Sequence, residues 1–125
     1  ENRFCRMVLD EPKAAIILQK LDVSPEWKML DFSVRIRAKD VVTGDEAWKT
    51  GQFQFLFMDE AGKVVGGWNR LKVTEDTDGW VTMTKKGVKV PATAKALKCQ
   101  VGVWGAKGTF EFDDVSVKVA ETQLP

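Results

Sequence analysis

The chain has 125 residues, 44% of them hydrophobic, which fits one domain with a single packed core. Its 19 basic and 18 acidic residues nearly cancel, and this argues against a nucleic-acid-binding protein, which normally concentrates basic residues on one face. No apolar run approaches the roughly 20 residues of a membrane-spanning helix, and the N-terminus lacks the features of a signal or transit peptide.

The first third of the chain alternates between apolar and polar residues. Two strands are predicted at Arg3–Leu9 and Ala14–Val23, with a turn at Asp10–Pro12 between them. In Met29–Lys39, the even-numbered residues are apolar and most odd-numbered residues are polar or charged. This pattern is typical of a strand with one buried face.

The middle of the chain continues this pattern. Asp40–Gly51 contains glycines and several charges, which predicts a loop. Gln52–Asp59 follows as a strand, with three phenylalanines on one face and Gln52, Gln54, Leu56 and Met58 on the other. Turns are expected at Asp59–Lys63 and Glu75–Gly79, with a strand at Val64–Trp68 between them that is broken by Gly66-Gly67.

The last third also reads as strands. Trp80–Val90 is a predicted strand with a bulge at Gly87, and Ala96–Trp104 alternates after the connection at Pro91–Ala94. A turn at Gly105–Gly108 leads to a final strand, Thr109–Ala120. About eight strands with no convincing helix predict an all-β sandwich of two antiparallel sheets.

Several short motifs of the chain share one family resemblance. They are Asp78-Gly79-Trp80, Val88–Leu97, Gly102–Gly105, Gly108–Val117 and, earlier, Met29–Arg37 and Gln52–Gly62. Together they resemble the carbohydrate-binding modules of the family 4/9/22 type, and they cover most of the chain. The resemblance implies a galactose-binding-like jelly roll over residues 1–125, excised from a larger protein.

The resemblance also raises the question of a metal. In relatives, an N-terminal segment and an aspartate of the last strand hold a structural calcium, and Asp113 matches that aspartate. The N-terminal segment has no counterpart before Glu1. Calcium needs six to eight oxygen ligands at about 2.4 Å. The alternatives are therefore a calcium at Asp113, or an exposed acidic pair of Asp113 and Asp114. No other cofactor is expected.

Tryptophans are the aromatic residues best suited to bind sugar here. An indole can lie flat on the apolar face of a pyranose while amides and guanidinium groups bind its hydroxyls. The chain has five tryptophans and no tyrosine. By analogy with the family, Trp80 is expected in the core. Trp27 follows Ser24-Pro25-Glu26 and is expected to cover one end of the core.

The other three tryptophans each have two interpretations. Trp104 is predicted to point outward, as a stacking platform or folded back over the edge of the sandwich. Trp68 follows two glycines and precedes Asn69 and Arg70, so it either binds sugar with them or caps the core. Trp48 is either a binding-loop aromatic or a plug beneath its loop.

Four polar residues are predicted to point away from the phenylalanine-rich interior: Arg35, Arg37, Gln54 and Gln100. If their strands share a sheet, they form a polar strip edged by Trp104, which would suit a sugar. The alternative is an ordinary solvated outer face.

Catalysis is not expected. The chain has no histidine, which excludes His metal sites and Ser-His-Asp or Cys-His chemistry. The acidic pairs lie mostly in turns or are adjacent in sequence, unlike the two opposed carboxylates of a glycosidase. Cys5 and Cys99 are predicted to be free thiols, with a disulfide as the alternative if the protein is exported.

These observations favour non-catalytic carbohydrate binding by a secreted module. The expected ligand is a β-glucan or related plant or microbial polysaccharide, and the expected role is to hold an attached glycoside hydrolase near its substrate. The alternative is a spacer domain that packs against a catalytic domain and has no sugar site. Neither nucleic acid nor a membrane is an expected partner.

Overall fold

The computed structural model describes residues 5–120, which form six β-strands and no helix. The strands are β1 (Cys5–Asp22), β2 (Met29–Val42), β3 (Gly51–Met58), β4 (Val64–Val73), β5 (Val81–Lys89) and β6 (Ala96–Val119). All pairings are antiparallel, so the all-β prediction is confirmed. Within this part of the chain, no segment is a helix able to cross a membrane.

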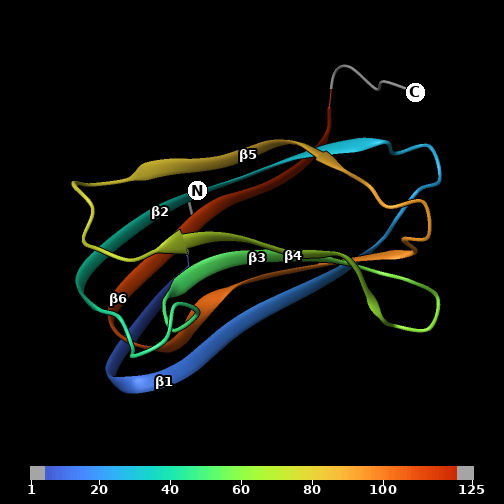
Figure 1. Ribbon diagram of the computed structural model, residues 1–125. Helices are drawn as coiled ribbons and strands as arrows, with labels where there is room; N and C mark the ends of the chain where they lie inside the picture. Colours follow the sequence, from blue (N-terminus) through green and yellow to red (C-terminus); the bar gives the residue numbers. More distant parts are fainter. Residues whose placement is uncertain (1–4, 121–125) are drawn as a thin grey trace.

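The strands form two layers because β6 passes from one to the other (Figure 1). Its first half pairs with β3, its second half pairs with β2, and β1 follows it along both. The β3 layer therefore contains β4, β3, the first half of β6 and the second half of β1. The β2 layer contains β5, β2, the second half of β6 and the first half of β1.

The predicted turns at Asp10–Pro12 and Gly105–Gly108 are bends inside the continuous strands β1 and β6. At the corner, the pairing of β1 with β6 shifts register between Leu9↔Gly108 and Lys13↔Ala106 but resumes on both sides. Gly105 and Gly108 have φ values of 64° and 131°, which side chains rarely adopt. The first two and the last two predicted strands are thus joined, giving six strands instead of eight. Arg3 and Phe4 of the first predicted strand lie outside the described residues.

The predicted bulge and turns elsewhere are confirmed. Gly87 has a φ of 65°, beside a register shift in the pairing of β2 with β5. At the tip of the β3–β4 hairpin, Gly62 has a φ of 81° and donates its N–H to the Asp59 carbonyl. Glycine relieves the steric cost at such positions.

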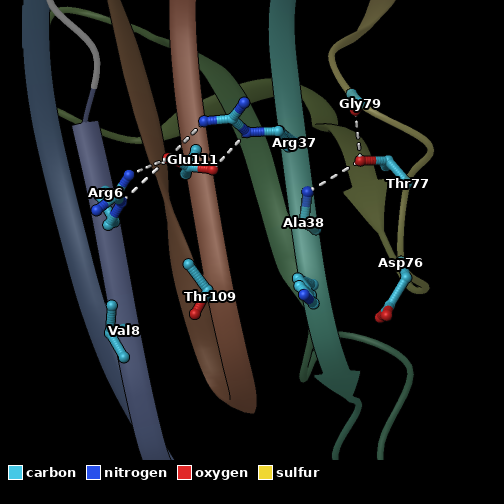
Figure 2. A pocket seen from close by; sticks show the side chains of 10 residues that line it. Arg6, Val8, Arg37, Ala38, Asp76, Thr77, Gly79, Thr109 and Glu111 are labelled. Carbon is cyan, nitrogen blue, oxygen red and sulfur yellow. Dashed lines mark hydrogen bonds and ion pairs between the residues drawn. The ribbon is translucent and has the colours of Figure 1, made fainter.

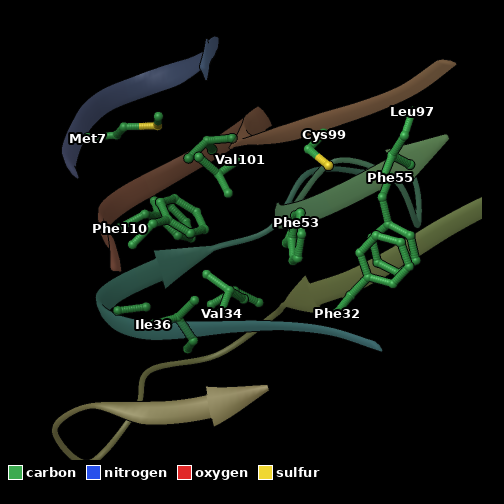
Figure 3. Close-up of a cluster of buried hydrophobic side chains, with 14 of the residues drawn as sticks. Met7, Phe32, Val34, Ile36, Phe53, Phe55, Leu97, Cys99, Val101 and Phe110 are labelled. Atoms are coloured by element: carbon green, nitrogen blue, oxygen red, sulfur yellow. The ribbon is translucent and has the colours of Figure 1, made fainter. Parts of the chain in front are cut away.

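The core lies between the two layers and is rich in phenylalanine (Figure 3). Phe32 of β2 stacks on Phe55 of β3, with ring centroids 3.8 Å apart and an interplanar angle of 12°. Because β2 and β3 are not hydrogen-bonded neighbours, this contact shows that the layers pack face to face. The inward faces predicted for both strands are confirmed.

Strand β3 is buried on both faces, which its alternation did not predict. Gln52, Gln54 and Leu56 point away from the core, yet they are only 1%, 7% and 2% exposed. Outward residues reach such burial when taller side chains on flanking strands or loops surround them. Neighbouring side chains therefore cover most of the outer face of β3.

Both cysteines are free, as predicted. They lie on different strands, and Cys99 is buried in the core cluster while Cys5 is half-buried. Burial raises the pKa of the Cys99 thiol to about 11, because an apolar environment disfavours the thiolate.

We expect Cys99 to resist thiol reagents in the native protein. With a pKa of about 11, only about one thiol in a thousand is ionised at about pH 8. Labelling of a Cys5→Ala variant with a chromogenic disulfide should be slow until denaturant is added. A Cys99→Ala variant is the matched control, and rapid native labelling of Cys99 would contradict the assigned burial.

Candidate functional site

A row of polar side chains crosses the outer face of the β3 layer. In the strand register, Gln54 of β3 lies between Arg70 of β4 and Gln100 of β6. Trp68 on β4 and Trp104 on β6 lie an even number of residues from Arg70 and Gln100, so they belong to the same outer face. We call these five residues the glutamine face.

Hydrogen bonds order the row. Arg70 Nε donates to Gln54 Oε1 at 3.4 Å, and Gln54 Nε2 donates to Gln100 Oε1 at 3.0 Å. The Gln100 side-chain NH₂ group has no protein partner among the described residues. The row therefore holds two amides in fixed orientations and offers N–H donors to a polar ligand.

Indole rings stand on both sides of this row. Trp68 is 59% exposed, with its ring centroid 5.4 Å from the Arg70 guanidinium carbon. It does not cap the core, so one of its two predicted interpretations is wrong. Trp104 is half-buried on β6, opposite Ala14 of β1. Two rings flanking a low polar row are suited to contact the apolar faces of sugar units.

The loop before β3 covers one end of the glutamine face. Gln52 Nε2 donates to the Trp48 carbonyl at 2.7 Å, while the Trp48 ring is 42% exposed and donates to Glu46. Trp48 is therefore not a plug. Thr50 Oγ1 and Gln52 Oε1 are buried without a hydrogen-bond partner in the described part of the chain. Such an atom costs roughly 1–3 kcal/mol, so any group that reaches it stabilises this end.

Arg35 and Arg37 do not join this row, and the predicted strip of four residues is wrong in this respect. Both point outward from β2, which belongs to the other layer. Their guanidinium carbons lie 5.3 and 4.7 Å from the centroid of the Trp80 ring. Trp80 is half-buried on this surface and lies outside the core cluster, which corrects the interior position predicted for it.

The outer face of the β2 layer has its own hollow of about 530 Å³ (Figure 2). At its centre, Glu111 of β6 lies between Arg6 of β1 and Arg37 of β2. Arg37 Nε donates to Glu111 Oε1 at 2.6 Å, Arg37 Nη2 donates to Oε2 at 3.1 Å, and Arg6 Nε donates to Oε2 at 3.0 Å. Sequence reasoning missed Arg6 and Glu111, because a period-2 pattern does not pair strands far apart in the chain.

The carboxyls of this hollow are not tuned for acid catalysis. Hydrogen bonds from Arg37 and Arg6 hold the pKa of Glu111 below its ordinary value, against the opposing effect of burial. Backbone N–H groups of Val41 and Asp40 lower the pKa of Asp76 in the same way. A glycosidase needs one carboxyl with a raised pKa as its general acid. Glu111 and Asp76 are instead ion-pair and hydrogen-bond acceptors.

We expect stability to fall in acid because of Glu111. Its folded-state pKa lies below the ordinary 4.5, so its contribution is present above that value and is lost as pH falls through the folded pKa. Urea unfolding from about pH 7 to about pH 3 should show this loss, and a Glu111→Gln variant should show less of it. An unchanged pH profile in Glu111→Gln would contradict the role of the ion pair.

In the described part of the chain, Asp113 has an arginine and a backbone N–H as neighbours. Asp113 lies opposite Arg35 in the strand register, and its Oδ1 accepts the N–H of Asp114. Arg35 Nη1 also lies 3.4 Å from Asp114 Oδ2. Residues 5–120 contain no spatial cluster of three or more acidic, cysteine or histidine side chains that could hold a metal ion. These residues alone do not fit a calcium ion, and the predicted site at Asp113 stays a prediction.

The fold is shared with solved structures of low sequence identity. The enzymatically active domain of tailspike protein 4 from bacteriophage CBA120 matches with a TM-score of 0.65 and 16% identity, over 86% of this chain and 14% of that chain. A CBM4 carbohydrate-binding module matches with a TM-score of 0.63 and 14% identity, over 94% of this chain and 71% of that chain. A CBM61 module in complex with β-1,4-galactotriose matches with a TM-score of 0.55 and 16% identity, over 92% of this chain and 69% of that chain.

No family model and no curated protein matches the sequence. At these identities the structural matches show the fold alone. They confirm the jelly-roll β-sandwich that the resemblance implied. The chain corresponds to only a small part of the tailspike domain, whose activity is that of a much larger chain.

Proposed function

We propose that this protein binds polysaccharide on the glutamine face without catalysing a reaction. The observation that carries the proposal is the ordered row Arg70–Gln54–Gln100, flanked by the outward-facing Trp68 and Trp104. Planar amides and a guanidinium bind ring hydroxyls, and indoles cover the apolar faces of the sugar. The fold is also that of the matching carbohydrate-binding modules.

The shape of this face favours a single glycan chain over a crystalline surface. Gln54 lies low and buried, while Trp68 stands exposed beside it. A flat crystalline polymer would need its aromatic contacts in one plane. We infer a soluble β-glucan or related plant or microbial polysaccharide as the ligand. The module would act outside the cell, keeping an attached glycoside hydrolase at high effective concentration near that polymer.

A matched pair of arginine variants tests which face binds. Arg70→Ala removes a guanidinium from the glutamine face, and Arg35→Ala removes one from the opposite outer face. In affinity electrophoresis against soluble β-glucan and xylan, we expect retardation of the wild type and of Arg35→Ala, and a clear loss in Arg70→Ala. Equal migration of both variants with the wild type, or a loss in Arg35→Ala alone, would refute the assignment.

A spacer role is the second candidate, and one observation favours it. Ile16, Ile17 and Leu18 are 43%, 51% and 53% exposed on β1, whose only described partner strand is β6. Consecutive exposed apolar residues on a strand edge are suited to pack against a neighbouring domain. If no glycan retards the wild-type protein in the same electrophoresis, this role replaces sugar binding.

A further inference from the structure

A second and larger hollow lies at one end of the sandwich. Its volume is about 1020 Å³, and its walls come mainly from the β1–β2 connection and from the segment between β5 and β6. We call it the end pocket. None of the glutamine-face residues lines it. Its size suits a short oligosaccharide, since small-molecule sites usually measure roughly 300–1,000 Å³.

The lining of the end pocket combines an apolar surface with positive charge. Trp27 and Pro91 contribute to its apolar part, and Lys28, Lys89 and Lys95 are exposed around it. In the described part of the chain, no aspartate or glutamate belongs to the lining. The whole chain has nearly equal numbers of basic and acidic residues, so this local excess of three lysines is not a general property of its surface.

Backbone hydrogen bonds fix the walls of the pocket. The Val90 N–H donates to the Lys28 carbonyl at 2.9 Å, and the Val23 N–H donates to the Lys95 carbonyl at 2.9 Å. The backbone N–H of Lys95 in turn donates to the carbonyl of Met58, at the end of β3, at 2.8 Å. These bonds tie the two connections to each other and to the end of β3, and a preformed site loses little conformational entropy on binding.

The ring of Trp27 is part of this fixed structure. It is half-buried and packs against the core, in agreement with the prediction that it covers one end of the core. Trp27 thus both packs against the core and contributes to the pocket lining. A supported indole is a suitable platform for the C–H face of a pyranose ring.

We propose that the end pocket binds a sugar unit that carries a carboxylate, a uronic acid. Trp27 stacks on the pyranose ring, and the ammonium groups of Lys28, Lys89 and Lys95 pair with the carboxylate. This site is additional to the neutral-glycan site on the glutamine face and does not depend on it. A polysaccharide with both neutral and acidic units could therefore engage the protein at two places.

A pair of ligands that differ mainly in charge tests this proposal. Calorimetric titration with tetragalacturonate should show binding, and the methyl-esterified tetrasaccharide should bind roughly tenfold more weakly or not at all. Adding about 0.5 M NaCl should weaken the binding of tetragalacturonate and leave the binding of the ester unaffected, because salt screens the ammonium–carboxylate attraction. Equal binding of both ligands would overturn the proposal.

Matched lysine variants locate the site. A triple Lys28→Gln, Lys89→Gln, Lys95→Gln variant should lose tetragalacturonate binding by about tenfold or more. A control triple variant at three other exposed lysines loses the same charge and should bind as the wild type does: Lys63→Gln, Lys72→Gln and Lys118→Gln. Equal losses in both variants would show that net charge alone drives binding, which overturns the pocket assignment.

A spectroscopic readout separates this proposal from the proposed function. The indole N–H resonance of Trp27, assigned with a Trp27→Phe variant, should shift when tetragalacturonate is added. A Trp68→Ala variant should keep this shift even if its binding of neutral glycans is lost. If the Trp27 resonance does not move, the end pocket is not the site, whatever the result for the glutamine face.

Discussion

Replacing Trp68 by alanine should weaken the binding of a soluble β-glucan oligosaccharide about 30-fold. Buried tryptophan contacts at binding sites commonly contribute about 2 kcal/mol or more, which corresponds to that factor. The ring is 59% exposed in the free protein and forms no part of the core cluster, so the free energy of unfolding should hardly change. Calorimetric titration with the oligosaccharide and urea unfolding of the same variant measure the two effects separately.

The control for this prediction is the indole on the opposite surface. Trp80→Ala removes a ring that lies against Arg35 and Arg37 on the outer face of the β2 layer. It should leave glycan affinity within about twofold of the wild type, because no glutamine-face contact is lost. A loss of affinity in Trp80→Ala, together with normal binding in Trp68→Ala, would place the sugar on the other layer.

Replacing Phe55 by alanine should destabilise the fold by about 3–5 kcal/mol. The side chain is 0% exposed, its ring stacks on Phe32, and its centroid lies 5.2 Å from that of Phe53. Alanine would remove apolar area from the contact between the layers and leave a cavity that neighbouring strands cannot readily close. Because small domains are stable by roughly 5–15 kcal/mol, this is a large fraction of the total.

Urea denaturation followed by tryptophan fluorescence measures this loss. Val115→Ala is the matched control, since Val115 is 47% exposed and its truncation should change the free energy of unfolding by only about 0.5 kcal/mol. A Phe55→Ala variant destabilised by less than about 1 kcal/mol would mean that the two layers do not pack through these rings.

The sequence predicted most of what depends on local pattern. Alternation in β2 placed its apolar residues inward, and the three phenylalanines of β3 were expected on one face, as found. The strand segments and the β3–β4 hairpin followed from the same pattern and from turn glycines. The exposure of Trp48, Trp68 and Trp104 was left open by the sequence, and the interior position predicted for Trp80 was wrong.

What the sequence did not predict is which outer face a residue joins. Period-2 alternation separates inward from outward residues, but a sandwich has two outer faces. Arg35 and Gln54 both point outward, yet they lie in different layers. Their separation depends on the corner where β6 changes layer. The meeting of Arg6 with Glu111 depends on pairing between the first and last strands, which no local pattern encodes.

The threading of β6 through both layers has a consequence for how the protein reaches its native state. Neither layer can be completed before β6 is available, since β2 and β3 both need β6 as their central neighbour. During synthesis, folding should therefore wait until β6 has emerged from the ribosome, which leaves the earlier strands exposed to chaperones. Refolding in vitro should be slow, in the millisecond-to-second range typical of chains whose native pairings join distant segments.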